Sequence, residues 1–134
     1  MASHIALLHS VTIGDGRRLV MAEWRAMMAA VGVDNPRTWL ATGNALFDSE
    51  NATIAQLEQR LEAAFAQSFG RQVDTIVKTA ADWTRLVAAN PFPDEAERDC
   101  TRLVVRVMRK PLDRAALEQL LPYATQGERL AITH

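Results

Sequence analysis

The feature that most constrains the fold is an amphipathic helix predicted between Thr53 and Gly70. Thr53 and Gln56 have the spacing of a capping box, and Gly70 stands where such a helix ends. Between these ends the apolar residues recur at helical spacing, at Ile54, Leu57, Leu61, Phe65 and Phe69. A helix with one apolar stripe has to bury that stripe against a second layer, so the neighbouring segments decide the fold.

Those neighbouring segments predict a sheet. Residues 5–13 are apolar on both faces and predict a buried strand, and residues 20–31 predict a helix that stops at Gly32. Further segments predict a hairpin with short strands at 39–42 and 45–47 around a tight Gly43-Asn44 turn, and a strand at 72–78. This βαββαβ order is that of the ferredoxin-like plait. We therefore predict an α+β fold with a ferredoxin-like α/β domain over residues 1–79.

The second half, residues 80–134, predicts an incomplete second α/β plait-like unit. Its elements are a helix at 80–89 capped by Thr79, an acidic loop at 90–99, a strand at 101–108, a helix after Asp113 and a strand at 129–133. Two strands are too few for an independently stable sheet. This half therefore either packs on the first domain or borrows strands from another subunit, and we expect a homodimer.

Several stretches resemble one bacterial protein family. "IALLHSVTIG", "MAEWRAMMAAVG", "TGNALF" and "AANPFP" are similar to the motifs of a widespread bacterial family of unknown function, whose members begin with an ALLRGINVGG-like strand and loop followed by an SGNVVF-like hairpin. The resemblance implies two consecutive plait-like domains and no established activity. This chain has His9 where the family usually has arginine and Thr12 where it has asparagine. A family site that used those two residues would be altered here.

Composition narrows the classes of partner. Fifteen basic and sixteen acidic residues leave a net charge of -1, whereas nucleic-acid binding rests on a basic excess, so a nucleic-acid partner is not expected. The single Cys100 excludes an intrachain disulfide and a multi-cysteine zinc site. No segment has the pattern of a signal peptide or a membrane span. We expect a cytoplasmic protein without a membrane partner, metal or cofactor.

The loop "IGDGRRL" is the main candidate for a binding site. A turn between a strand and a helix points backbone N–H groups outward, and two arginines beside it suit a phosphate or carboxylate. The candidate ligand-binding residues are His9, Thr12, Gly14, Gly16, Arg17, Arg18 and Asn44. The alternative is an ordinary loop with solvated arginines, because no complete phosphate-binding motif is present.

Other polar and aromatic residues have simpler interpretations. Glu58 and Glu62 are expected on the solvent-exposed face of their helix. Trp24, Trp39 and Trp83 are interpreted as core or domain-interface residues, and Trp39 on the hairpin is the candidate for an exposed one. We predict a non-catalytic binding module for a small anionic ligand or a protein partner. The alternatives are an enzyme with His9 and an arginine at the same loop, for which no nucleophile or acid is identified, and an assembly module that pairs through its C-terminal strand.

Overall fold

The computed structural model describes residues 1–133 of the chain. They form two compact units that divide between Trp83 and Thr84, and each unit is described by itself. The domain boundary predicted after residue 79 lies at the junction between the last strand and the helix that follows it. That the two halves are separate domains stays a prediction.

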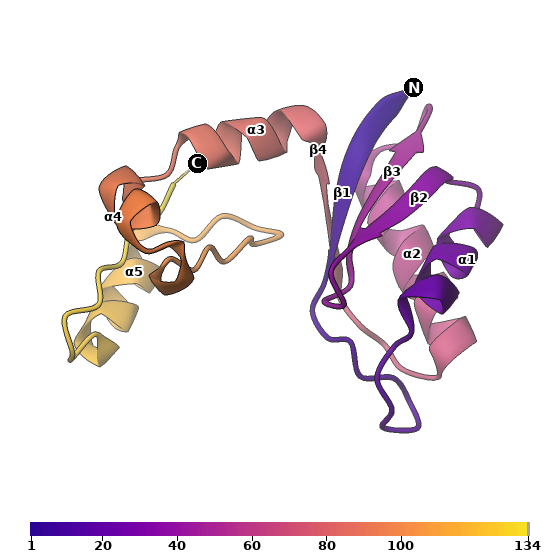
Figure 1. Ribbon diagram of the computed structural model, residues 1–134, viewed down its shortest axis with the longest axis horizontal. Helices are drawn as coiled ribbons and strands as arrows, with labels where there is room; N and C mark the ends of the chain where they lie inside the picture. Colours follow the sequence, from indigo (N-terminus) through magenta and orange to yellow (C-terminus); the bar gives the residue numbers. More distant parts are fainter. Residues whose placement is uncertain (134) are drawn as a thin grey trace. The chain divides into compact units, whose positions relative to one another are not determined.

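The first unit contains a four-stranded antiparallel sheet with two helices on one of its faces (Figure 1). Its elements are β1 (Ala2–Leu8), α1 (Met21–Ala30), β2 (Asp34–Trp39), β3 (Asn44–Ser49), α2 (Ile54–Phe69) and β4 (Thr75–Thr79). The strand order is β2-β3-β1-β4, with β1 paired to both β3 and β4. This element order and sheet are those of a ferredoxin-like plait, as the sequence predicted.

The core of this unit lies between the sheet and the two helices. Trp24 from α1 and Phe65 from α2 are fully buried, and their rings meet edge to face at a centroid distance of 5.7 Å. From the sheet, Phe47 and Val77 are buried against them because alternate residues of each strand point to the helices. The expectation that Trp24 belongs to the core is therefore confirmed.

Helix α2 begins and ends where the sequence predicted. The Gln56 N–H donates to Thr53 Oγ1 at 3.2 Å, and the Thr53 N–H donates to Gln56 Oε1 at 2.9 Å. Gly70 follows the helix in the left-handed conformation, with φ of 67°. Leu57, Leu61 and Phe65 of the apolar stripe are fully buried. The sequence of this segment alone predicted the helix because the residues at both of its ends and the spacing of its apolar residues indicate the same bounds.

The strand predicted over residues 5–13 is wrong in its extent. β1 begins at Ala2 and ends at Leu8, so residues 9–13 are not part of the strand. The Ile13 N–H donates to Arg17 O at 3.0 Å, and the Leu19 N–H donates to Val11 O at 2.6 Å. Residues 11–13 therefore pair with residues 17–19, which follow closely in the chain, and not with the sheet. Ile13, only 4% exposed, and Leu19 are buried in the core of the unit, and the partly buried Val11 packs against that core.

The hairpin is also displaced from its predicted position. β2 ends at Trp39, which pairs with Asn44, so residues 40–43 form the turn instead of Gly43-Asn44 alone. Gly43 has φ of 85°, and a Cβ atom there would lie 2.8 Å from the Leu8 side chain. The earlier start of β2 was hidden by Asp34-Asn35-Pro36, which has the composition of a loop. Pro36 is tolerated because β2 is an edge strand.

Strand β4, at the other edge of the sheet, is capped by two glutamates of α2. The Thr75 N–H donates to Glu62 Oε1 and the Val77 N–H donates to Glu58 Oε1, each at 3.0 Å. The two glutamates are four residues apart on a helix, a rise of about 6 Å, and the two strand residues are two apart, a rise of about 6.8 Å. The spacing of the glutamates therefore matches the spacing of the strand N–H groups that they bind. The interpretation of these glutamates as solvent-facing residues is therefore wrong: they occupy donors that an edge strand would otherwise offer to another chain.

The second unit is built from short helices. Helix α3 (Ala80–Ala88) leads into it, followed by α4 (Pro93–Arg98), η1 (Cys100–Arg102), α5 (Arg114–Leu120) and η2 (Leu121–Tyr123). The caps predicted for two helices are present: Thr79 Oγ1 accepts from the Asp82 N–H, and Asp113 accepts from the Ala116 N–H. The predicted acidic loop at 90–99 instead contains α4.

The strands predicted at 101–108 and 129–133 are absent from the described residues, so the second unit as described is not a partial plait. Thr101 and Arg102 lie in η1, and the valines that follow have no neighbouring strand with which to pair. Val87 of α3 is 62% exposed. From Thr84 to Thr133 no described residue is buried. Favourable strand composition does not form a strand without a hydrogen-bonding partner.

Candidate binding site

The candidate loop runs from His9 to Val20 and is held in one conformation by its own backbone. Thr12 and Arg18 form an isolated antiparallel bridge, and the Gly16 N–H donates to Ile13 O at 2.9 Å. The exposed His9 donates its backbone N–H to Asp74 O at 3.0 Å, at the entry to β4. Many of the loop's N–H groups are thus engaged within the protein and do not point outward for an anion.

Gly14 fixes this loop to the end of α2. Its N–H donates to Phe69 O at 2.8 Å, and a Cβ atom on residue 14 would lie only 2.5 Å from the Gly70 oxygen. Glycine is required here for close approach of two backbones. Gly16, in contrast, has φ of 85° with open space around it, so it serves the turn itself.

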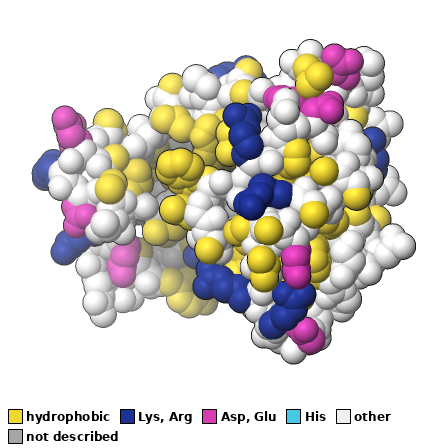
Figure 2. Space-filling view, turned by 45° about the vertical axis from the view of Figure 1, so that its right-hand side comes forward, with side chains coloured by type: hydrophobic (Ala, Val, Ile, Leu, Met, Phe, Trp, Pro, Cys, Tyr) yellow, Lys and Arg dark blue, Asp and Glu magenta, His cyan; other side chains and the backbone are white. Residues whose placement is uncertain are grey.

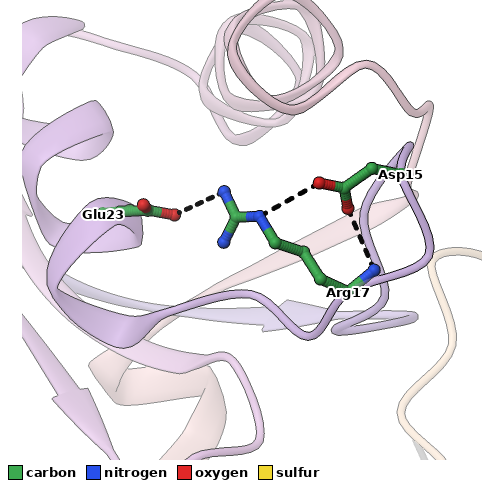
Figure 3. Close-up of polar contacts among 3 residues, drawn as sticks. All are labelled: Asp15, Arg17 and Glu23. Carbon is green, nitrogen blue, oxygen red and sulfur yellow. Dashed lines mark hydrogen bonds and ion pairs between the residues drawn. The ribbon is translucent and has the colours of Figure 1, made fainter.

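Arg17 is occupied by two carboxylates of the same segment (Figure 3). Its Nη2 lies 3.1 Å from Glu23 Oε2 and its Nε lies 3.3 Å from Asp15 Oδ2. Asp15 Oδ1 also accepts the Arg17 backbone N–H at 2.9 Å. The charge of Arg17 is therefore balanced locally, and an external anion would have to compete with both carboxylates.

Arg18 and Arg71 are placed differently. Arg18 Nη2 donates to Ala41 O in the hairpin turn at 2.7 Å, and Arg71 Nη1 donates to Thr12 O at 3.1 Å. A guanidinium carries five N–H donors, so each of these single contacts leaves donors for a ligand. Sequence reasoning missed Arg71. The signal that could have found it is topological: the segment after α2 returns to the end of the sheet from which the β1–α1 loop leaves.

The hairpin turn lies beside this loop, through the contact between Arg18 and Ala41. The buried Trp24 Nε1 donates to Gly43 O at 3.2 Å and anchors the turn to α1. Asn44 is partly buried, and it lies opposite Trp39 on the sheet face away from the helices. Of the predicted residues, Arg18 thus reaches the hairpin and pairs with Thr12, whereas Arg17 turns toward Glu23 of α1.

The tip of the hairpin presents two large apolar side chains to solvent. Trp39 is 67% exposed, which confirms the expectation of an exposed tryptophan, and the adjacent Leu40 is 68% exposed. Leu40 has φ of 60°, a left-handed conformation that is strained for a residue with a branched side chain. We call Trp39 and Leu40 the hairpin tip.

Two surface hollows lie away from this loop. One is lined by Glu62, Gln72, Val73 and Asp74, and the other by Met1, Ala2, Ser49, Glu50 and Asn51. Neither lining includes a predicted site residue, although ligand sites for small molecules are usually concave.

Charge and metal-ligating groups are dispersed. Figure 2 shows basic, acidic and hydrophobic side chains interspersed on the visible face, without one continuous basic field. Among residues 1–133 no group of three or more His, Cys, Asp or Glu side chains could hold a metal ion. In the same residues, no helix is both long enough and apolar enough to cross a membrane.

These features define an α+β protein whose first unit is a ferredoxin-like plait with a loop and a hairpin gathered at one end. The chain belongs to the DUF1697 family, a family of proteins of unknown function, whose model matches residues 1–134. The structure of the conserved bacterial protein SP0830 from Streptococcus pneumoniae is similar to this chain, with a TM-score of 0.65. Their sequences are 21% identical, and the match covers 95% of this chain and 67% of that one. A search of curated proteins finds no match.

Proposed function

We propose that this protein is a non-catalytic binding module, and that the hairpin tip and its neighbouring arginines bind an acidic segment of a protein partner. The observation that carries the proposal is the exposure of Trp39 and Leu40, each about two-thirds accessible and adjacent in the chain. Burying such side chains is favourable, and tryptophan and arginine are the residues most enriched among those that dominate protein interfaces.

The backbone of the turn supports this role. Leu40 holds a left-handed conformation, with φ of 60°, although nothing buries its side chain. Strained backbone persists where the surroundings impose it, and such positions are enriched at ligand-binding sites. Here the hydrogen bonds from Trp24 Nε1 to Gly43 O and from Arg18 to Ala41 O fix the turn. The hairpin tip is therefore presented in one conformation, which lowers the entropy cost of binding.

The charges next to the hairpin tip favour an acidic partner. Arg18 contacts the turn directly, and Arg37 lies two residues before Trp39 on the same face of β2. Guanidinium groups bind carboxylates in a bidentate manner. A short peptide with one large apolar side chain and neighbouring carboxylates would satisfy both kinds of contact.

A second candidate is a small anionic ligand held by Arg18 and Arg71. These arginines converge on one bridge, since Arg71 contacts Thr12 O and Arg18 lies opposite Thr12. A thermal-shift series with inorganic phosphate and citrate tests this candidate. A ligand at a hundred times its dissociation constant adds about 2.7 kcal/mol of stability. The candidate requires a shift that Arg18→Ala/Arg71→Ala abolishes, and no shift with either anion excludes it for these probes.

Selection from a random peptide library on the immobilised protein tests the main proposal. We expect enriched peptides to combine acidic and large apolar residues, and to lose binding to Trp39→Ser/Leu40→Ser. The matched control is Tyr123→Ser, which removes an aromatic ring that is 81% exposed in the second unit. Peptides that bind the hairpin-tip variant as well as the wild type, or no enrichment at all, would refute the proposal.

A further inference from the structure

The turn of the candidate loop contains an Asp-Gly sequence, at Asp15 and Gly16, and both residues are exposed. No other aspartate or asparagine among residues 1–134 precedes a glycine. At such a sequence the backbone nitrogen of the glycine can attack the carboxyl carbon of the aspartate, because glycine has no side chain to block the approach. Apart from its chain neighbours, no atom of the described residues lies within 4 Å of the position that a Cβ atom of Gly16 would occupy. The surroundings therefore leave this reaction open.

The attack forms a cyclic succinimide. A bond forms between the Gly16 nitrogen and Asp15 Cγ, and one carboxylate oxygen leaves as water, with the proton of that nitrogen and one proton from solvent. Water then opens the ring. Opening at Cγ restores aspartate, whereas opening at the main-chain carbonyl leaves Gly16 joined through Cγ, which is an isoaspartate. The product has the mass of the original chain and one additional carbon in its main chain, and water is the only co-reactant.

Arg17 holds the carboxylate that has to react. Asp15 Oδ1 accepts the Arg17 backbone N–H at 2.9 Å, and Asp15 Oδ2 lies 3.3 Å from Arg17 Nε, so both oxygens are directed at residue 17 (Figure 3). Glu23 holds Arg17 in turn, with Oε2 at 3.1 Å from Nη2. The attacking nitrogen is also engaged, because the Gly16 N–H donates to Ile13 O at 2.9 Å. The reaction requires the carboxylate to leave Arg17 and this N–H to leave Ile13.

We propose that Asp15-Gly16 is a site of spontaneous isoaspartate formation, and that Arg17, held by Glu23, is the residue that restrains the reaction. The proposal gives Arg17 a role that requires no ligand, in agreement with the local balance of its charge by two carboxylates. It rests only on contacts within residues 13–23, and it does not depend on the proposed function.

Isomerisation would loosen the loop. Ile13 and Leu19 are buried, so the two ends of the turn are fixed in the core. The 3.0 Å hydrogen bond from the Ile13 N–H to Arg17 O closes the turn at the ordinary length of the main chain. One additional main-chain carbon disrupts this closure. Arg18 follows directly, so its contact with Ala41 O in the hairpin turn is lost with it. A modification of one exposed residue thereby alters the contact between the loop and the hairpin.

Ageing of the full chain at neutral pH in heavy-oxygen water tests the proposal. Peptide mapping with electron-transfer fragmentation distinguishes isoaspartate from aspartate, and passage through the succinimide adds one oxygen from solvent. We expect labelled isoaspartate at residue 15 in the wild type. We expect roughly fivefold more in Arg17→Ala, the factor that corresponds to the loss of an exposed ion pair of about 1 kcal/mol. Glu23→Gln leaves Arg17 in place without the charge that holds it, and it should also age faster than the wild type.

Arg18→Ala is the matched control. It removes the neighbouring arginine, whose guanidinium contacts Ala41 O and not Asp15, so it should age as the wild type does. The chain unfolded in guanidinium chloride lacks all of these contacts and should react fastest. If Arg17→Ala and Glu23→Gln form isoaspartate at residue 15 no faster than the wild type, or if Arg18→Ala accelerates it equally, the proposed restraint is overturned. Isoaspartate that accumulates first at another aspartate would overturn the assignment of the site.

Discussion

Replacing Gly14 by alanine tests how closely the candidate loop is held against the end of α2. A Cβ atom on residue 14 would lie 2.5 Å from the Gly70 oxygen and 2.9 Å from the Phe69 oxygen. Both are backbone atoms and cannot rotate away. The loop therefore has to move outward, which breaks the 2.8 Å hydrogen bond from the Gly14 N–H to Phe69 O.

The magnitude follows from three contributions. Overpacking at a close contact costs about 1–3 kcal/mol, and the lost hydrogen bond about 1 kcal/mol. Alanine also restricts the unfolded chain, which offsets roughly 0.4–1 kcal/mol. We expect Gly14→Ala to lower the free energy of unfolding by about 2–3 kcal/mol.

Urea unfolding followed by tryptophan fluorescence measures this change, since the buried Trp24 reports on the first unit. Gly16→Ala is the control: its φ of 85° is strained for alanine, but no atom lies within 4 Å of the new Cβ. That strain alone costs about 1–2 kcal/mol. If Gly14→Ala destabilises the protein less than Gly16→Ala does, the close contact between the loop and α2 is not as described.

Three further predictions concern the sheet. Glu58→Ala/Glu62→Ala leaves the outward N–H groups of β4 without acceptors, so light scattering should show that the variant self-associates. The double glutamine variant keeps both acceptors and should not associate, and equal association of the two variants would contradict the capping of this edge. The Ser3 hydroxyl donates to Asp48 at 2.7 Å and lowers the pKa of that carboxyl below 3.8. This stabilisation is present above pH 3.8 and is lost as pH falls through the lowered pKa. Ser3→Ala should therefore reduce the loss of unfolding free energy on acidification, and an unchanged dependence of unfolding free energy on pH would contradict the role of this hydrogen bond. His4→Phe removes a buried ring nitrogen, Nδ1, that has no hydrogen-bond partner, and it should raise the free energy of unfolding by about 1 kcal/mol. A lower free energy of unfolding in a urea titration would show that this nitrogen is not an unsatisfied buried group.

The sequence predicts those elements of this fold whose signals are local. Helix α2 has its cap residues, its apolar stripe and its terminal glycine within one segment, and its bounds follow from them. The order of strands and helices in the first unit is predictable for the same reason, because each element has a hydrophobic or turn pattern within its own segment. Exact strand bounds do not emerge, because pairing decides them. Trp39 pairs with Asn44 across a turn in which Gly43 lies against the Leu8 side chain, a contact between segments that are distant in the sequence.

Long-range contacts explain why the candidate site was only partly predictable. The sequence shows two neighbouring arginines, but not that Arg17 is paired with Glu23 while Arg18 reaches the hairpin. Arg71, 59 residues from Thr12 in the sequence, carries no motif. The segment at 101–108 shows the converse case. Its composition is typical of a strand, yet a strand needs a partner that the described chain does not supply.

The measurement that tests the proposed function most directly is an NMR titration of the protein with the strongest peptide from the library selection. The account predicts that the amide resonances that shift belong to residues 37–43 and to Arg18, and that Trp39→Ser/Leu40→Ser removes these shifts. Saturable shifts confined to the second unit, or to the sheet edge at β4, would contradict it and would place the binding surface elsewhere on the molecule.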